Sequence, residues 1–319
     1  MSQHLRLALY CPGCMPGYHL PYFAAESRSI YERHGLTVEL VDPEPGPENV
    51  RAAAAGTYDL CLTSVAYYLG AKSDDPSLEA KFVFMVARRP HMAAFCLDDR
   101  RTAGGRATES LEDLEGATVL GTRDSPFVRE YLAMMDRLGV QPGALLDVPY
   151  QRSVDALLDG EGDVAVDHLD LAPAFDAAAE PRALRVRALP FYEAGLDVYG
   201  SGLVAGGHVL ARRPDAVRRL LRTLPEALDV TCCEPGEGLA LMTERFPHLD
   251  PRRAMAGWEA GEPLLFPEAD PPSALGRMDA ETWRRTIAFH ADAHGTRRLA
   301  PEDVYDASFL PEQVAARRA

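Results

Sequence analysis

The chain has 319 residues, of which 47% are hydrophobic and 25% charged, and its formal net charge is −15. This length allows two domains, and the composition is that of a protein with a substantial core. The negative charge argues against non-specific nucleic-acid binding, which needs clustered positive charge, but local arginines can still bind a small anion.

The first part of the chain alternates short apolar strands with helices. Strands are predicted at 5–10, 36–41, 59–62 and 81–86, and helices at 21–34, 50–56 and 65–72. The same alternation restarts after Pro90. Strands are then predicted at 92–97, 118–121, 144–148, 163–166 and 204–210, with helices at 111–114, 126–138 and 153–158. Alternation of this kind predicts parallel sheets.

The C-terminal part is mostly helical, with helices predicted at 214–224, 237–246, 251–258 and 281–294. In the last helix His290 shares a face with Trp283 and Ile287, which favours a packed or surface histidine over a ligand. The two alternations and the helical tail predict two lobes, residues 1–90 plus 203–319 and residues 91–202. A cleft between lobes is a preferred place for a small-molecule site.

The loop after the first strand carries the most distinctive chemistry. It contains Cys11, Cys14, Tyr18 and His19 among prolines and glycines, and it would stand at the carboxyl end of the strand. Cys11, Cys14 and His19 could supply three ligands to zinc or iron, with one position left open, and they are also the candidate catalytic residues. The Cys-x-x-Cys spacing also fits a redox pair, and the plain alternative is that the thiols only line the loop. His19 could contact a ligand, act as a general acid or base, or cap the loop backbone.

Further candidate ligand contacts follow other predicted strands. Thr122, Arg123 and Ser125 precede a helix whose first N–H groups could bind an anion, although Ser125 could also be a plain cap. The remaining candidates lie at strand ends or at the crossover between lobes, and they are Ser64, Arg88, Asp167, His168, Tyr192 and Tyr199.

Several segments resemble the thiamine-pyrimidine synthase family. They are Pro-Gly-Tyr-His-Leu-Pro-Tyr-Phe at 16–23, Gly-Leu-Thr-Val-Glu-Leu-Val at 35–41, and the blocks at 55–60, 114–119, 158–164 and 301–310. That family shares its fold with the binding proteins for sulfonates, nitrate and thiamine pyrimidines. The resemblance implies an α/β, two-lobed clamshell of the type II periplasmic-binding-protein class with a helical C-terminal segment.

The chain departs from the synthase at its catalytic positions. Thr63 stands where the synthase has the lysine that binds pyridoxal phosphate, and Tyr67 stands at its substrate histidine. The synthase's cysteine-rich iron motif has no counterpart near residues 199–202. We therefore expect neither the pyrimidine synthase reaction nor a covalent pyridoxal phosphate adduct.

Three functions remain for a fold of this kind, and the third, a cytosolic sensor that closes on its ligand and signals to a partner, has no direct support in the sequence. The first is a cytosolic enzyme, of lyase, decarboxylase or biosynthetic type, that acts on a small heteroaromatic or carboxylated metabolite. The alternative is the substrate-binding subunit of an ABC importer for a thiamine-pyrimidine-, sulfonate- or nitrate-like solute. In both cases the expected partner is a small organic ligand, anionic or heteroaromatic, and neither nucleic acid nor an inserted membrane segment is expected.

The start of the chain favours the enzyme. Met1-Ser2-Gln3-His4 runs directly into the first strand without a basic and apolar leader, which predicts a cytoplasmic protein. On this prediction, an ABC permease would be a partner only if the protein were exported.

Overall fold

The computed structural model describes residues 3–9, 16–101, 105–123, 125–149, 152–266 and 275–311. The chain forms two compact units. The first unit comprises Met1–Arg89, Val198–Ile287 and Arg297–Ala319, and the second comprises Pro90–Asp197 and Ala288–Thr296. Each unit is described by itself below.

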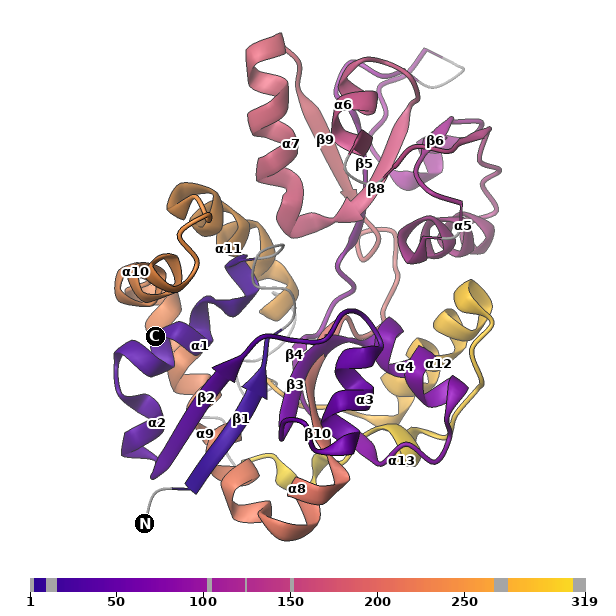
Figure 1. Ribbon diagram of the computed structural model, residues 1–319. Coiled ribbons are helices and arrows are strands. Elements are labelled where there is room, and N and C mark those ends of the chain that lie inside the picture. The colour runs from indigo at the N-terminus through magenta and orange to yellow at the C-terminus, as the bar shows by residue number, and fades with distance from the viewer. Residues whose placement is uncertain are drawn as a thin grey trace. The chain divides into compact units, whose positions relative to one another are not determined.

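The first unit is built on a five-stranded sheet of order β2-β1-β3-β10-β4 (Figure 1). Its strands are β1 (Gln3–Ala8), β2 (Leu36–Val41), β3 (Leu60–Ser64), β4 (Ala80–Ala87) and β10 (Ser201–Gly206). β1 pairs in parallel with β2 and β3, whereas β10 runs antiparallel to both β3 and β4. The register from Gln3↔Leu36 to Ala8↔Val41 follows the alternation of apolar residues in β1.

Helices cover both faces of this sheet (Figure 1). One face carries η1 (Pro16–His19), α1 (Leu20–Ser27), α2 (Ile30–Arg33), α9 (Pro214–Cys233), α10 (Gly236–Arg245) and α11 (Pro251–Leu265). The other face carries α3 (Glu48–Ala55), α4 (Val65–Asp74), α13 (Pro301–Val304) and the start of α12 (Ala280–His294). Two short helices complete the unit, α8 (Gly207–Arg212) and η7 (Ala307–Phe309).

Buried aromatic rings hold the second of these faces together. The Trp283 ring of α12 lies 5.1 Å from the Phe82 ring and 5.3 Å from the Tyr199 ring. Tyr68 packs on Phe82 with ring centres 4.8 Å apart, and its hydroxyl donates to the Ala80 and Val304 carbonyls. Large buried rings of this kind dominate the energetics of a core.

The second unit has its own five-stranded sheet of order β7-β6-β8-β5-β9. Its strands are β5 (Met92–Leu97), β6 (Val119–Leu120), β7 (Leu145–Leu146), β8 (Val164–His168) and β9 (Val186–Pro190). β6 is parallel to β7 and β8, and β5 is antiparallel to β8 and β9. Its helices are η2 (Leu111–Leu114), α5 (Pro126–Leu138), α6 (Ser153–Leu158), η4 (Leu169–Leu171), α7 (Ala172–Ala179) and η5 (Glu180–Arg182).

The end of α12 also belongs to the second unit, because the chain passes from one unit to the other between Ile287 and Ala288. The whole of 203–319 was predicted to belong to the first lobe. A helical sequence pattern predicts where a helix lies but not what each of its turns packs against. The assignment of residues 288–296 to the second unit therefore could not be predicted from the local sequence.

Several elements differ from the sequence expectation: α7 and β9 were not predicted, the helix predicted at 251–258 extends to Leu265, and three further differences have a local cause. The helix predicted at 21–34 is interrupted at Ser29, whose φ of 52° is left-handed, and so forms α1 and α2. The strand predicted at 204–210 is β10 followed by α8, with the change at Gly206 and Gly207. The helix predicted at 214–224 continues to Cys233 despite Pro225, because its apolar stripe continues through Ala227 and Leu228.

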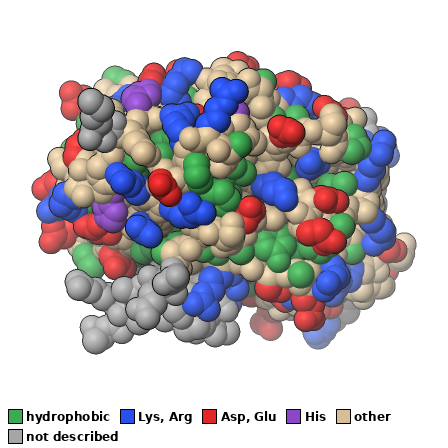
Figure 2. Space-filling view, turned by 90° about the horizontal axis from the view of Figure 1, so that it is seen from below, with side chains coloured by type: hydrophobic (Ala, Val, Ile, Leu, Met, Phe, Trp, Pro, Cys, Tyr) green, Lys and Arg blue, Asp and Glu red, His purple; other side chains and the backbone are tan. Residues whose placement is uncertain are grey.

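Charged side chains of both signs are interspersed on the face shown in Figure 2, where they surround smaller apolar areas. Within the described residues, no helix combines the length and the apolar character needed to cross a membrane.

Candidate functional site

In the first unit, the polar residues Ser64, Ser201 and Arg88 lie at one edge of the sheet. Ser64 is the last residue of β3, and it pairs with Ser201, the first residue of the antiparallel β10. Ser201 also pairs with Ala87 at the end of β4, so Arg88 follows at this edge. We call it the carboxyl edge of the first sheet, and it is where ligands bind in open α/β sheets.

Arg88 and Tyr199 contact each other at this edge. The Arg88 guanidinium carbon lies 5.9 Å from the centre of the Tyr199 ring, and Nη1 donates to the Arg277 carbonyl at 2.7 Å. The Tyr199 hydroxyl donates to Asp279 Oδ2 at 3.0 Å and accepts from the Asp279 N–H. Burial, reinforced by the charge of Asp279, raises the pKa of Tyr199 to about 12. The Tyr199 hydroxyl is therefore neutral, and its hydrogen bonds with Asp279 hold the ring beneath the half-buried Arg88 guanidinium.

The loop that leads from β1 toward α1 also starts at this edge. Cys11 and Cys14 lie outside the described residues, as does the side chain of Tyr18, so the metal, redox and catalytic roles of this loop stay predictions. The described part begins with η1, where Gly17 lies against α11. A Cβ on Gly17 would come within 2.4 Å of the Trp258 backbone nitrogen, so this contact requires glycine. His19, at the end of η1, is fully buried.

Residues Thr63 and Ser64 of β3 have different surroundings. Thr63 is fully buried, while the Ser64 hydroxyl caps α4 by accepting from the Tyr67 N–H at 3.3 Å. Lys72 is also buried, and burial lowers its pKa although nearby carboxylates oppose the shift. Its ammonium donates to the Leu78 carbonyl at 2.7 Å. The absence of a covalent pyridoxal phosphate adduct stays a prediction.

The second unit has a corresponding carboxyl edge at the end of β8. His168 is the last residue of β8 and pairs with Met92, so His91 lies beside it at the start of β5. The His91 and His168 rings are stacked with centres 5.4 Å apart, and the Phe127 ring meets His168 edge-on at 5.0 Å. The Asp167 carboxylate accepts from the His168 N–H at 2.7 Å.

Both histidines at this edge are neutral at pH 7. Burial lowers the pKa of His168 to about 4, although the charge of Glu130 opposes the shift. Burial also places the pKa of His91 well below its usual value, and the neighbouring His168 lowers it further. A neutral imidazole offers one N–H donor and one nitrogen acceptor to a neighbour.

The start of α5 lies at the same edge, because β6 is parallel to β8 and precedes this helix. The Ser125 hydroxyl caps α5 by accepting from the Val128 N–H at 3.2 Å. Thr122 Oγ1 donates to the Val148 carbonyl at 3.3 Å, while the Arg123 side chain is exposed. Half-buried Tyr192 follows β9 at this edge as well.

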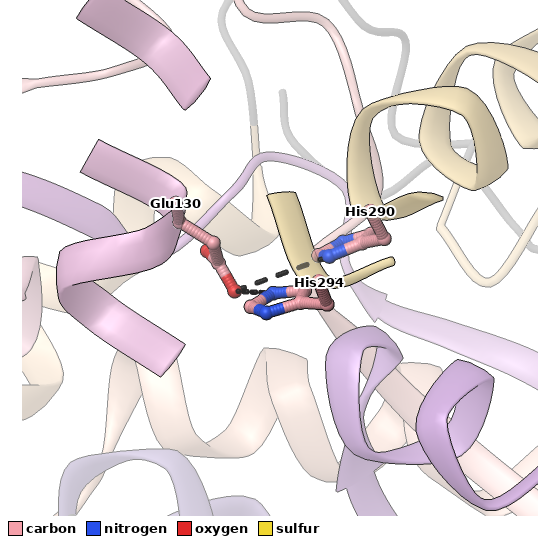
Figure 3. A group of neighbouring side chains, drawn as sticks. All are labelled: Glu130, His290 and His294. Carbon is pink, nitrogen blue, oxygen red and sulfur yellow. Dashed lines mark hydrogen bonds and ion pairs between the residues drawn. The ribbon is translucent and has the colours of Figure 1, made fainter. Parts of the chain in front are cut away.

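A third group of side chains lies within the second unit. Glu130 of α5 faces His290 and His294, which are one turn apart on α12 (Figure 3). None of these three residues was predicted as a ligand from the sequence. The spacing of the two histidines on a helix was a signal, but Glu130 lies 164 residues before His294, and only the fold brings them together.

The structure thus places the predicted residues in two sets, one in each unit. Ser64, Arg88 and Tyr199 lie at the carboxyl edge of the first sheet. Thr122, Arg123, Ser125, Asp167, His168 and Tyr192 lie at the carboxyl edge of the second. Sequence reasoning missed Ser201, His91 and Phe127, each of which adjoins a predicted residue at one of these edges.

Comparison with known proteins identifies the class. The model of the family described as NMT1/THI5 like matches residues 17–238, and the chain belongs to this family. No curated protein matches the chain by sequence.

Solved structures share the fold across the chain. The periplasmic aliphatic sulphonate-binding protein SsuA from Escherichia coli has a TM-score of 0.71 at 15% identity, covering 100% of this chain and 96% of that chain. The alkanesulfonate-binding protein SsuA from Xanthomonas axonopodis pv. citri, bound to MOPS, has a TM-score of 0.63 at 15% identity, covering 96% and 99%. A periplasmic sulfonate-binding protein SsuA from Methylobacillus flagellatus has a TM-score of 0.66 at 13% identity, covering 97% and 92%.

These comparisons confirm the predicted family resemblance and the α/β type II periplasmic-binding-protein fold. They contradict the prediction of a cytoplasmic location, because proteins that share the fold are described as periplasmic. That prediction rested on where the given sequence starts, and this does not decide where a protein works.

Proposed function

We propose that the protein binds a small organic anion as the solute-binding component of an ABC importer, and that it works outside the cytoplasmic membrane. The family match and the sulfonate-binding proteins of the same fold support this proposal. It replaces the cytosolic enzyme as the preferred function.

The observation that carries the proposal is the position of Arg88 at the carboxyl edge of the first sheet. Its guanidinium lies over the neutral ring of Tyr199, beside the strand ends that carry Ser64 and Ser201. A guanidinium presents five N–H donors in a fixed fork, which fits the oxygens of a sulfonate or carboxylate. In the second unit, taken by itself, the corresponding edge carries neutral imidazoles and the Phe127 ring, which can also contact an organic molecule.

The protonation of the two edge histidines favours binding over acid–base catalysis. A general base is most effective when its pKa lies near the working pH, whereas the pKa of His168 is lowered to about 4. These imidazoles are therefore suited to recognition.

One residue favours the second candidate, an enzyme. Asp170 in η4 is buried, and burial together with the charge of Asp167 raises its pKa to about 7. Its Oδ1 has no hydrogen-bond partner within the described part of the chain. A carboxyl group with this pKa could transfer a proton at neutral pH, so unchanged recovery of the bound solute must be tested.

The proposal is tested by calorimetric titration with an alkanesulfonate, nitrate and an aminopyrimidine. We expect one of these classes to bind, and Arg88→Ala to weaken its binding by at least about tenfold, because a charge-assisted hydrogen bond is lost. Arg253→Ala, which removes an exposed arginine from α11, is the matched control and should bind normally. Failure of all three classes to bind the folded protein would contradict the proposal, and normal affinity in folded Arg88→Ala would remove this edge from the site.

A further inference from the structure

Glu130, His290 and His294 form a compact set of side chains with metal-ligating atoms, and none of them is among the residues assigned to the carboxyl edges above. His294 Nε2 lies 3.1 Å from Glu130 Oε1, and His290 Nδ1 lies 3.9 Å from the same oxygen. One ligand atom from each residue lies within 4.8 Å of the other two (Figure 3). The two imidazole rings are stacked with an interplanar angle of 12°, so both present an edge to the carboxylate.

This spacing is close to that of a tetrahedral metal site. Zinc binds histidine nitrogen and carboxylate oxygen at about 2.0–2.2 Å, which separates ligand atoms by about 3.3 Å in a tetrahedron. The two separations from Glu130 Oε1 lie on either side of this value, and the ligand atoms of all three residues lie within 4.8 Å of one another. Side-chain rotations of about this size could bring the three atoms around one ion.

The three side chains are largely buried, unlike a cluster of charged residues on the surface. The exposed fraction is 8% for Glu130 and 4% for His290, and His294 is half-buried. His290 Nδ1 has no hydrogen-bond partner among the residues that the structure describes, although it faces a carboxylate. A buried polar atom in this situation is destabilising unless something binds it. A hydrogen-bonded Glu130–His294 pair accounts for two of the residues but leaves this nitrogen unexplained.

We propose that Glu130, His290 and His294 bind one zinc ion, or a divalent transition metal of the same class, and leave one coordination position open to water or a small ligand. Two histidines and one carboxylate are a known zinc ligand set. Calcium and magnesium are disfavoured, because these hard cations prefer sites built from oxygen. The proposed site uses none of the residues of the predicted Cys11, Cys14 and His19 site, and it does not depend on the identity of the solute.

The proposal is tested by calorimetric titration of the chelator-treated full chain with Zn²⁺ alone at pH 7. We expect one ion to bind per chain, and Mg²⁺ to give no signal. Glu130→Gln keeps the side-chain shape, and His294→Ala removes a half-buried ring. Each should weaken binding by more than the roughly 10–100-fold that loss of an outer-shell partner costs. His248→Ala, at an exposed histidine, is the matched control and should bind normally.

The loop thiols could also bind zinc, so the Cys11→Ser/Cys14→Ser double variant is titrated in parallel. It should retain the high-affinity ion, and Co²⁺ bound at this site should show no sulfur-to-metal charge-transfer absorption. Three outcomes would overturn the proposal: no Zn²⁺ binding by the folded chain, unchanged affinity in Glu130→Gln and His294→Ala, or loss of the ion in the cysteine variant.

Discussion

Each unit of the protein buries a carboxylate that faces histidine, and the two are satisfied differently. In the first unit, Asp59 accepts from the Arg6 N–H at 2.9 Å, lies 3.3 Å from His208 Nε2 and forms an ion pair with Arg213. In the second unit, the described partners of Glu130 are imidazoles, one within hydrogen-bond distance and one at 3.9 Å.

The difference shows which buried charge is structural and which has ligand-binding capacity. Asp59 has a guanidinium, a backbone donor and an imidazole around it, which is the compensation a buried carboxylate needs. The Glu130 set has no guanidinium among its described contacts and leaves a buried nitrogen without a hydrogen bond in the described part of the chain. Similar residue types can therefore serve stability in one unit and metal binding in the other.

The largest expected effect on stability comes from removing Asp59 from its contacts with His208 and Arg213. Asp59→Ala should lower the free energy of unfolding by about 3 kcal/mol, because it leaves a largely buried cluster without its anion. Glu130→Gln, measured without zinc, should cost less, since glutamine can still accept from His294. Urea unfolding of both variants checks this order. A larger loss of unfolding free energy in Glu130→Gln than in Asp59→Ala would contradict the claim that only Asp59 has a structural role.

A smaller effect is expected from pH. His168 and His290 have pKa values lowered to about 4, and that of His91 is also lowered, so the unfolded chain binds protons more readily below about pH 6.5. Stability should therefore fall as the pH drops from about 6.5 to 4, by at least about 2 kcal/mol. The lowered pKa of Glu130 acts in the same direction, because its contribution to stability is lost as the pH falls through the pKa that Glu130 has in the folded protein.

The pH effect should be confined to the second unit at first, because all three of these histidines belong to it. In the first unit, Asp279 and Glu226 have lowered carboxyl pKa values, so their contributions are lost only in more acidic solution. Urea unfolding at pH 7 and 4.5, together with amide exchange corrected for its intrinsic pH dependence, measures this. Equal stability at the two pH values, or earlier loss of protection in β3 than in β8, would contradict it.

Much of the fold could be predicted because local signals agreed with tertiary packing. The helix predicted at 126–138 has the bounds of α5, since Ser125 caps its start and Gly139 ends it with a φ of 70°. The break at Ser29 and the change from β10 to α8 were missed. The first depends on a left-handed residue that is not glycine, and the second lies at Gly206 and Gly207, between two short apolar runs that were taken for one strand.

Less of the candidate site could be predicted. Strand ends indicated Ser64 and His168, because ligands bind beyond the carboxyl ends of parallel strands, and the predicted crossover between lobes indicated Arg88. Ser201 and His91 reach the same edges through antiparallel strands, whose order in a sheet the local sequence does not reveal. The shared face with Trp283 and Ile287 indicated a packed role for His290, although this part of α12 lies in the second unit beside Glu130.

The central claim is that the protein binds its solute without changing it. The most direct test uses the solute class identified by titration, incubated with the protein at equal concentration and then in excess, released by denaturation and analysed by mass spectrometry. We expect one equivalent to be recovered per chain with unchanged mass, at any incubation time. A product that accumulates beyond one equivalent, and that is lost in Asp170→Asn, would show instead that the protein is an enzyme.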